Sequence, residues 1–179
     1  MAEPVEHAYA SHVVPKRGVA QALDVAAKVM AMSGGAIFCA LIAMSIVSIV
    51  GRKLFATPVQ GDVELMQMGA AVGAAAFLPL CELHDYHIKV DALTGWMSTR
   101  GRAACDGFAH FLLAAAAALF TWRTAVAAID ATSSGEVSTL LTVPVWQPVA
   151  LLVPSFALLT LCGLYRMGRS VLEAVGRSA

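Results

Sequence analysis

Long hydrophobic runs separated by short polar segments dominate the pattern of this chain. Four such runs occupy residues 29–50, 65–83, 103–129 and 143–164. Each is close to or longer than the roughly 20 residues that a helix needs to cross about 30 Å of hydrocarbon. The first and the last run contain no charged side chain, so neither has the polar face that a helix on the surface of a soluble protein needs.

Because hydrocarbon offers no water to the backbone, each of these runs is predicted to be helical. We therefore predict an all-α integral membrane protein with four transmembrane helices, with residues 18–167 forming one transmembrane domain. Residues 1–17 are polar, contain two prolines and are expected to form a mobile cytoplasmic tail. Residues 168–179 form a second, short and basic tail. The alternative, a soluble bundle of four long core helices, does not account for the first run.

Small residues mark a packing face in the second run. Gly69 and Gly73 are four residues apart and are surrounded by alanines, a spacing that lets the backbones of membrane helices approach closely. The motif does not say whether the partner helix belongs to this chain. Ahead of the first run, Asp24 and Lys28 are spaced for an ion pair on one helical face, either in an interfacial lead-in or in a plain continuation of the helix.

Basic residues are distributed unevenly over the polar segments. The N-terminal tail, the lead-in, the central loop (residues 84–102) and the segment after the fourth run hold nine of them: Lys16, Arg17, Lys28, Lys89, Arg100, Arg102, Arg166, Arg169 and Arg177. The other side holds Arg52, Lys53 and, near the end of the third helix, Arg123. Cytoplasmic segments of membrane proteins carry the excess of Lys and Arg. Both termini and the central loop are therefore predicted to be cytoplasmic, and the apolar side of residues 88–97 fits a short interfacial helix in that loop.

Composition agrees with a membrane protein. Hydrophobic residues make up 59% and charged residues 13% of the chain, whereas a soluble domain carries roughly 25% charged residues. The net charge is zero, so nothing points to a nucleic-acid partner. The four cysteines are scattered without a C-x-x-C spacing, which indicates neither a disulfide framework nor a zinc site.

Histidines and acidic residues near the central loop are the only candidates for metal or haem ligation. His84, His87 and Asp91 have metal-like spacing, and Cys81 and His110 could lie nearby. A loop between two membrane helices needs polar residues in any case, so we expect no metal and no cofactor. The chain has no nucleophile–base pattern, phosphate loop or H-E-x-x-H motif, so we do not expect an enzyme. Asp106 and His110 share a helical face, which we expect to point inward or toward a protein partner.

Charged residues also meet where the first run ends and the second begins. Arg52 closes the first helix, and Asp62 and Glu64 open the second after a short link. An ion pair between Arg52 and Glu64 would lower the cost of holding both charges at the membrane surface. The alternative is that Arg52 and Lys53 extend to lipid phosphates.

Several residues follow one another in a fixed order along the chain, and together they form what we call the ordered set. It comprises Arg52, Phe55, Pro58, Glu64 and Leu65 around the first link, Gly73-Ala74-Ala75 in the second run, His87-Ile88-Lys89-Val90-Asp91 in the central loop, and Pro144, Trp146 and Pro154 in the last run. This set resembles the DctQ-type small permease subunit of tripartite ATP-independent periplasmic (TRAP) transporters over most of residues 29–167. Two departures are Gly61-Asp62, where a tryptophan often precedes the glutamate, and Glu82-Leu83-His84-Asp85, where a basic pair often precedes the histidine.

The resemblance implies a multi-pass subunit of the bacterial inner membrane, surrounded by the lipid bilayer. Its implied partners are a large TRAP permease subunit, which carries the solute and coupling ions, and a periplasmic solute-binding protein, which captures a small solute such as an organic acid. The small subunit would have no catalytic site and would enlarge the membrane-fixed scaffold of the large one. Two other functions stay open: a four-helix membrane cytochrome using His84, His87 or His110, and a self-assembling membrane scaffold.

Overall fold

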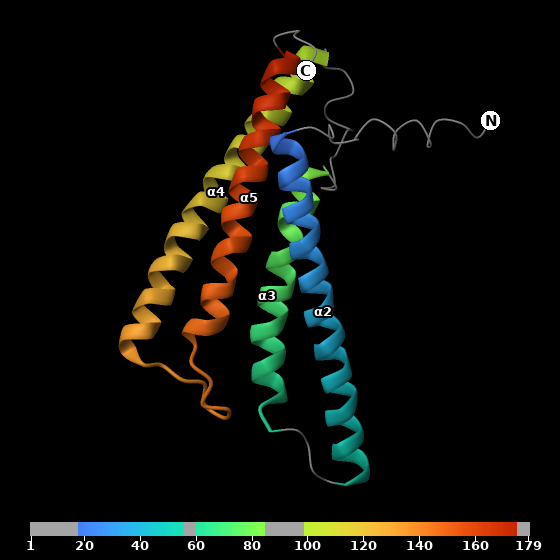
Figure 1. Cartoon of the computed structure of the whole chain (residues 1–179), viewed down its shortest axis with the longest axis vertical. Coiled ribbons are helices and arrows are strands. Elements are labelled where there is room, and N and C mark those ends of the chain that lie inside the picture. Colours follow the sequence, from blue (N-terminus) through green and yellow to red (C-terminus); the bar gives the residue numbers. More distant parts are fainter. Residues whose placement is uncertain (1–17, 56–59, 85–98, 175–179) are drawn as a thin grey trace, which may run out of the picture.

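The computed structural model describes residues 18–55, 60–84 and 99–174, which fold into four long helices (Figure 1). These are α2 (Val19–Leu54), α3 (Asp62–Leu83), α4 (Thr99–Ser134) and α5 (Trp146–Ala174). Each contains a stretch that is long and apolar enough to cross a membrane. The prediction of an all-α membrane protein with four spanning helices is therefore confirmed.

Each helix extends beyond its hydrophobic run at one end or at both, although α5 begins only at Trp146, three residues after the start of its run. The difference is largest for α2 and α4, which have 36 residues each. A hydrophobic run marks only the residues that suit hydrocarbon, whereas helical hydrogen bonding continues into the polar ends. The lead-in is thus a continuation of α2, and Lys28 Nζ lies 2.6 Å from Asp24 Oδ2, as the spacing of these residues predicts.

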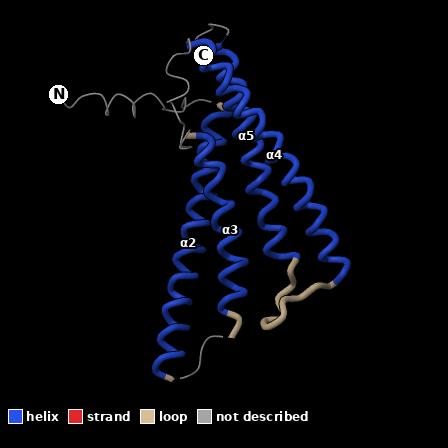
Figure 2. The backbone as a smooth tube through the Cα atoms, turned by 180° about the vertical axis from the view of Figure 1, so that it is seen from behind, coloured by secondary structure: helices blue, strands red, loops and turns tan. Residues whose placement is uncertain are grey.

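The helices form two hairpins, one of α2 with α3 and one of α4 with α5. The hairpins contact each other mainly through α3 and α5. Both views show them meeting near the start of α2 and the end of α5, here called the terminal end, and diverging toward the other end of the bundle (Figures 1 and 2). That second end, here called the link end, holds the connections between α2 and α3 and between α4 and α5.

The glycines of the small-residue motif pack against α2 of the same chain. Gly69 lies against the side chain of Leu41, and Gly73 lies against the ring of Phe38. A Cβ atom on Gly34 would lie 2.8 Å from the carbonyl oxygen of Gly73, closer than real Cβ atoms approach. The helix that the motif serves is therefore the neighbouring helix of its own hairpin.

A second group of contacts joins the hairpins at the terminal end. Leu23 and Ala27 of α2, Leu83 of α3 and Cys162 of α5 form one buried cluster. Within the other hairpin, Gly163 of α5 admits Ala114 of α4 at close range. The buried cluster therefore joins the two hairpins where they converge.

Candidate functional site

Glu64 fastens the link between α4 and α5 to the start of α3. Its carboxylate accepts hydrogen bonds from Ser138 Oγ at 2.7 Å, from the Leu140 backbone N–H at 3.1 Å and from the Leu141 N–H at 3.3 Å. These donors all belong to the second hairpin. One side chain thus connects the two hairpins at the link end, where their ribbons diverge.

The second link is a compact loop that presents those donors. Val137 and Pro144 form an isolated antiparallel bridge, and the Ser138 N–H donates to the Val143 carbonyl at 2.8 Å. At its tip, Leu141 lies over Gly61, which has a positive φ of 76°. A Cβ atom at Gly61 would overlap the Leu141 side chain, so this position needs glycine both for its backbone and for the contact.

Arg52 pairs with Asp62 and not with Glu64, so the predicted ion pair between Arg52 and Glu64 is wrong. Arg52 Nη2 lies 3.5 Å from Asp62 Oδ2, to which Ser48 Oγ donates at 2.5 Å. Residues two apart on a helix point about 200° away from each other. Asp62 therefore faces α2 while Glu64 faces the second link, and one carboxylate serves each neighbour.

Two further polar contacts lie toward the terminal end. His110 Nδ1 is 2.6 Å from Glu82 Oε1, with 7% and 1% of the two side chains exposed. This contact connects α3 to α4, and it confirms that His110 faces inward; Asp106 is half-buried. His84 Nε2 lies 2.8 Å from Asp24 Oδ1, connecting the end of α3 to α2.

The other residues of the ordered set occupy separate places. Leu65 is half-buried, and its N–H donates to the Gly61 carbonyl at 3.0 Å in the first turn of α3. Pro144 precedes α5, Trp146 begins it, and Pro154 lies inside it. Glu64 and Trp146 belong to different parts of the ordered set, and the second link brings both to the link end of the bundle. Pro58, His87, Asp91 and the expected interfacial helix lie outside the described residues.

Sequence reasoning missed the partners of these carboxylates. Ser48, Ser138 and the backbone of residues 140 and 141 carry no distinctive pattern, although a link rich in Ser and Thr is a source of donors. Within the described residues, no group of three His, Cys, Asp or Glu side chains could hold a metal ion.

An apolar groove of about 250 Å³ lies between α3 and α5 near the link end. Its lining is Gln67, Met68, Ala71, Val72, Val145, Pro148, Val149 and Leu152. The groove lies where the hairpins diverge, on the terminal side of the Glu64 contact. It is a consequence of the open packing at this end and contains one polar side chain.

The two departures from the resemblance are both used for contacts within the chain. Gly61 admits Leu141 and Asp62 binds Ser48 and Arg52, while Glu82 binds His110 and His84 binds Asp24. These positions therefore have roles in joining helices of the subunit itself.

A family model for the DctQ component of tripartite ATP-independent periplasmic transporters matches residues 41–173. The match includes the C-terminal part of α2 and all of α3, together with α4 and nearly all of α5. No curated protein and no solved structure matches the chain. The matched segment is well over half of the chain and contains both the Glu64 contact with the second link and the Glu82–His110 contact. The chain therefore belongs to the DctQ family and is a small, multi-pass component of a TRAP transporter in the bacterial inner membrane.

Proposed function

We propose that this subunit supports a large TRAP permease subunit in the ion-gradient-driven uptake of a small solute, of the organic-acid class, that a periplasmic binding protein delivers. The observation that carries the proposal is the family match over residues 41–173, which reaches all four spanning helices. It favours this function over a membrane cytochrome or a self-assembling scaffold.

The use of polar side chains supports a scaffolding role. Asp62, Glu64 and Glu82 each bind a neighbouring helix or link of the same chain. A transporter's own substrate site is usually built from broken helices near the middle of the membrane, and the four helices here are continuous over their stated bounds. Movement of the solute is accordingly assigned to the large subunit.

We further propose that the terminal end is cytoplasmic and the link end periplasmic. The uneven distribution of Lys and Arg supports this orientation. The Glu64-bound second link would then face the compartment of the solute-binding protein. Labelling of a cysteine introduced at Thr139 by a membrane-impermeant reagent in intact cells tests the orientation, because Thr139 is exposed. Failure to label it in cells, with labelling after lysis, would reverse the assignment.

The function is tested by reconstitution. The small subunit, the large permease and the binding protein are combined in vesicles with an imposed ion gradient, and uptake of radiolabelled organic acids is followed. Uptake is expected with all three proteins and not when the small subunit is omitted. Undiminished uptake by the large subunit and binding protein alone would refute the supporting role, as would uptake by the small subunit alone.

A further inference from the structure

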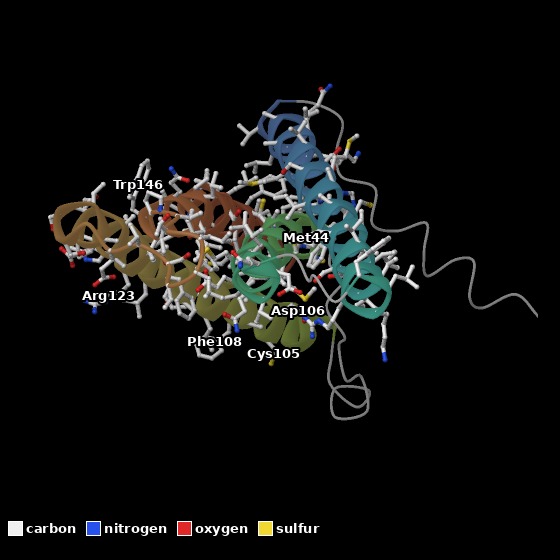
Figure 3. The ribbon with its side chains drawn as sticks, turned by 90° about the horizontal axis from the view of Figure 1, so that it is seen from below. Met44, Cys105, Asp106, Phe108, Arg123 and Trp146 are labelled. Atoms are coloured by element: carbon white, nitrogen blue, oxygen red, sulfur yellow. The ribbon has the colours of Figure 1, made fainter. Side chains whose placement is uncertain are left out.

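Arg123 lies on the outer side of α4, deep within the part of the helix that suits hydrocarbon. The side chain is exposed, and it projects away from α2 and α3 (Figure 3). The sequence alone placed it near the end of the third helix, but α4 continues for about three further turns to Ser134. Arg123 is therefore an internal residue of the spanning segment.

The pairing of α4 with α5 gives the depth of Arg123. Gly107 lies against Ser170, Gly163 lies against Ala114, and the rings of Phe120 and Phe156 are 5.6 Å apart. This antiparallel register places Arg123 level with Pro154, about eight residues or 12 Å into α5 from Trp146. Trp146 suits the membrane interface, and the first charged residue at the opposite end of the span is Arg166. Trp146 and Arg166 are about 30 Å apart along α5, which equals the thickness of the hydrocarbon layer.

The direction of the helix makes escape to the membrane surface difficult. The Cα–Cβ bond of a helical residue tilts toward the helix N-terminus, and α4 begins at the terminal end. Arg123 thus leaves the backbone pointing away from the link end, which is the nearer surface. Extending the guanidinium to the headgroups would require the side chain to turn back along its own helix.

The surroundings of Arg123 within the chain are apolar. Leu119, Phe120, Val126 and Ala127 lie one turn away on either side, and Trp122 is 70% exposed. The nearest carboxylate along the helix, that of Asp130, is two turns or about 10 Å further on. In the part of the chain that the structure describes, no carboxylate lies within ion-pair distance of Arg123. An exposed, unpaired charge at this depth is costly and calls for a partner.

We propose that the outer face of α4, centred on Arg123 and Trp122, is the surface on which a transmembrane helix of the large permease subunit docks, and that this helix supplies a carboxylate to Arg123. The proposal rests on the proposed function. The unpaired positive charge favours a protein partner, because a bilayer offers no carboxylate at this depth. The large subunit is the membrane partner that the proposed function supplies. Among the described helices α4 packs mainly against α5 and contacts α3 through His110. Arg123 and Trp122 lie outside these contacts and are exposed.

The test is co-purification of the two subunits from membranes that express both. Arg123→Leu is expected to lower the recovery of the large subunit about threefold to tenfold, the scale of one polar contact between membrane helices. Arg123→Lys, which keeps the positive charge, is expected to retain part of the recovery of the large subunit. Lys53→Leu is the matched control, since it removes an exposed positive charge outside the proposed surface and should leave recovery unchanged.

Two further measurements make the result decisive. Thermal unfolding of the isolated small subunit should show Arg123→Leu to be at least as stable as wild type, so that lost recovery reports docking and not misfolding. Unchanged recovery with Arg123→Leu would overturn the inference while leaving the proposed function intact. Loss of a bound anionic lipid in native mass spectrometry, with recovery unchanged, would assign Arg123 to a lipid headgroup instead. Failure of the wild-type subunits to co-purify would refute both proposals.

Discussion

Adjacent glycines in α2 allow the helix contact at the centre of the first hairpin to be tested with one methyl group. A Cβ atom at Gly34 would lie 2.8 Å from the Gly73 carbonyl oxygen and 2.9 Å from Ala76 Cβ, both too close. A Cβ atom at Gly35 would meet only the Phe77 ring, at an ordinary 3.9 Å. The two substitutions to Ala add the same atoms to the same helix, so they differ only in what those atoms contact.

The expected magnitude follows from two opposing effects. Replacing Gly by Ala inside a helix favours folding by roughly 0.5–1 kcal/mol, and this gain is common to both variants. Overpacking a tight contact costs about 1–3 kcal/mol, and only Gly34→Ala incurs it. The free energy of unfolding of Gly34→Ala is therefore predicted to be about 1–3 kcal/mol below that of Gly35→Ala.

Reversible unfolding of the purified subunit in mixed micelles, titrated with a denaturing detergent, measures this difference. Helical content by circular dichroism provides the signal. Gly35→Ala should match or exceed wild type. Equal stability of the two alanine variants would refute the close contact between α2 and α3, and so the assignment of the small-residue motif to this hairpin.

Three other substitutions test the polar contacts and the link. Glu64→Gln keeps the shape of the side chain but removes its charge, and is expected to speed hydrogen exchange at the Leu140 and Leu141 amides; unchanged exchange would contradict their bonds to Glu64. Glu82→Leu leaves His110 buried without this partner and should lower the free energy of unfolding by about 1–3 kcal/mol. Adding His110→Leu should restore part of that stability. If the losses of the two single variants simply add in the double variant, the pair is contradicted. Gly61→Ala should destabilise more than Gly135→Ala, because both glycines have positive φ but only Gly61 faces a neighbouring side chain; equal melting temperatures would remove the Leu141 contact.

The hydrophobic pattern determined the four spanning helices and the membrane environment, because solubility in hydrocarbon is a property of each segment by itself. The order of small, acidic and aromatic residues along the chain was also enough to indicate the transporter family. Gly69 and Gly73 predicted a packing face for the same reason, since their spacing depends only on the local helix.

Partnerships between segments were decided by the tertiary structure alone. Whether Asp62 or Glu64 meets Arg52 depends on how α3 is rotated about its axis, and neither composition nor spacing records that angle. The depth of Arg123 depends on the register of α4 against α5, which the close contact of Gly163 with Ala114 sets. Hydrophobicity constrains how far a residue is from water, but rotation and register arise from packing between helices that are distant in sequence.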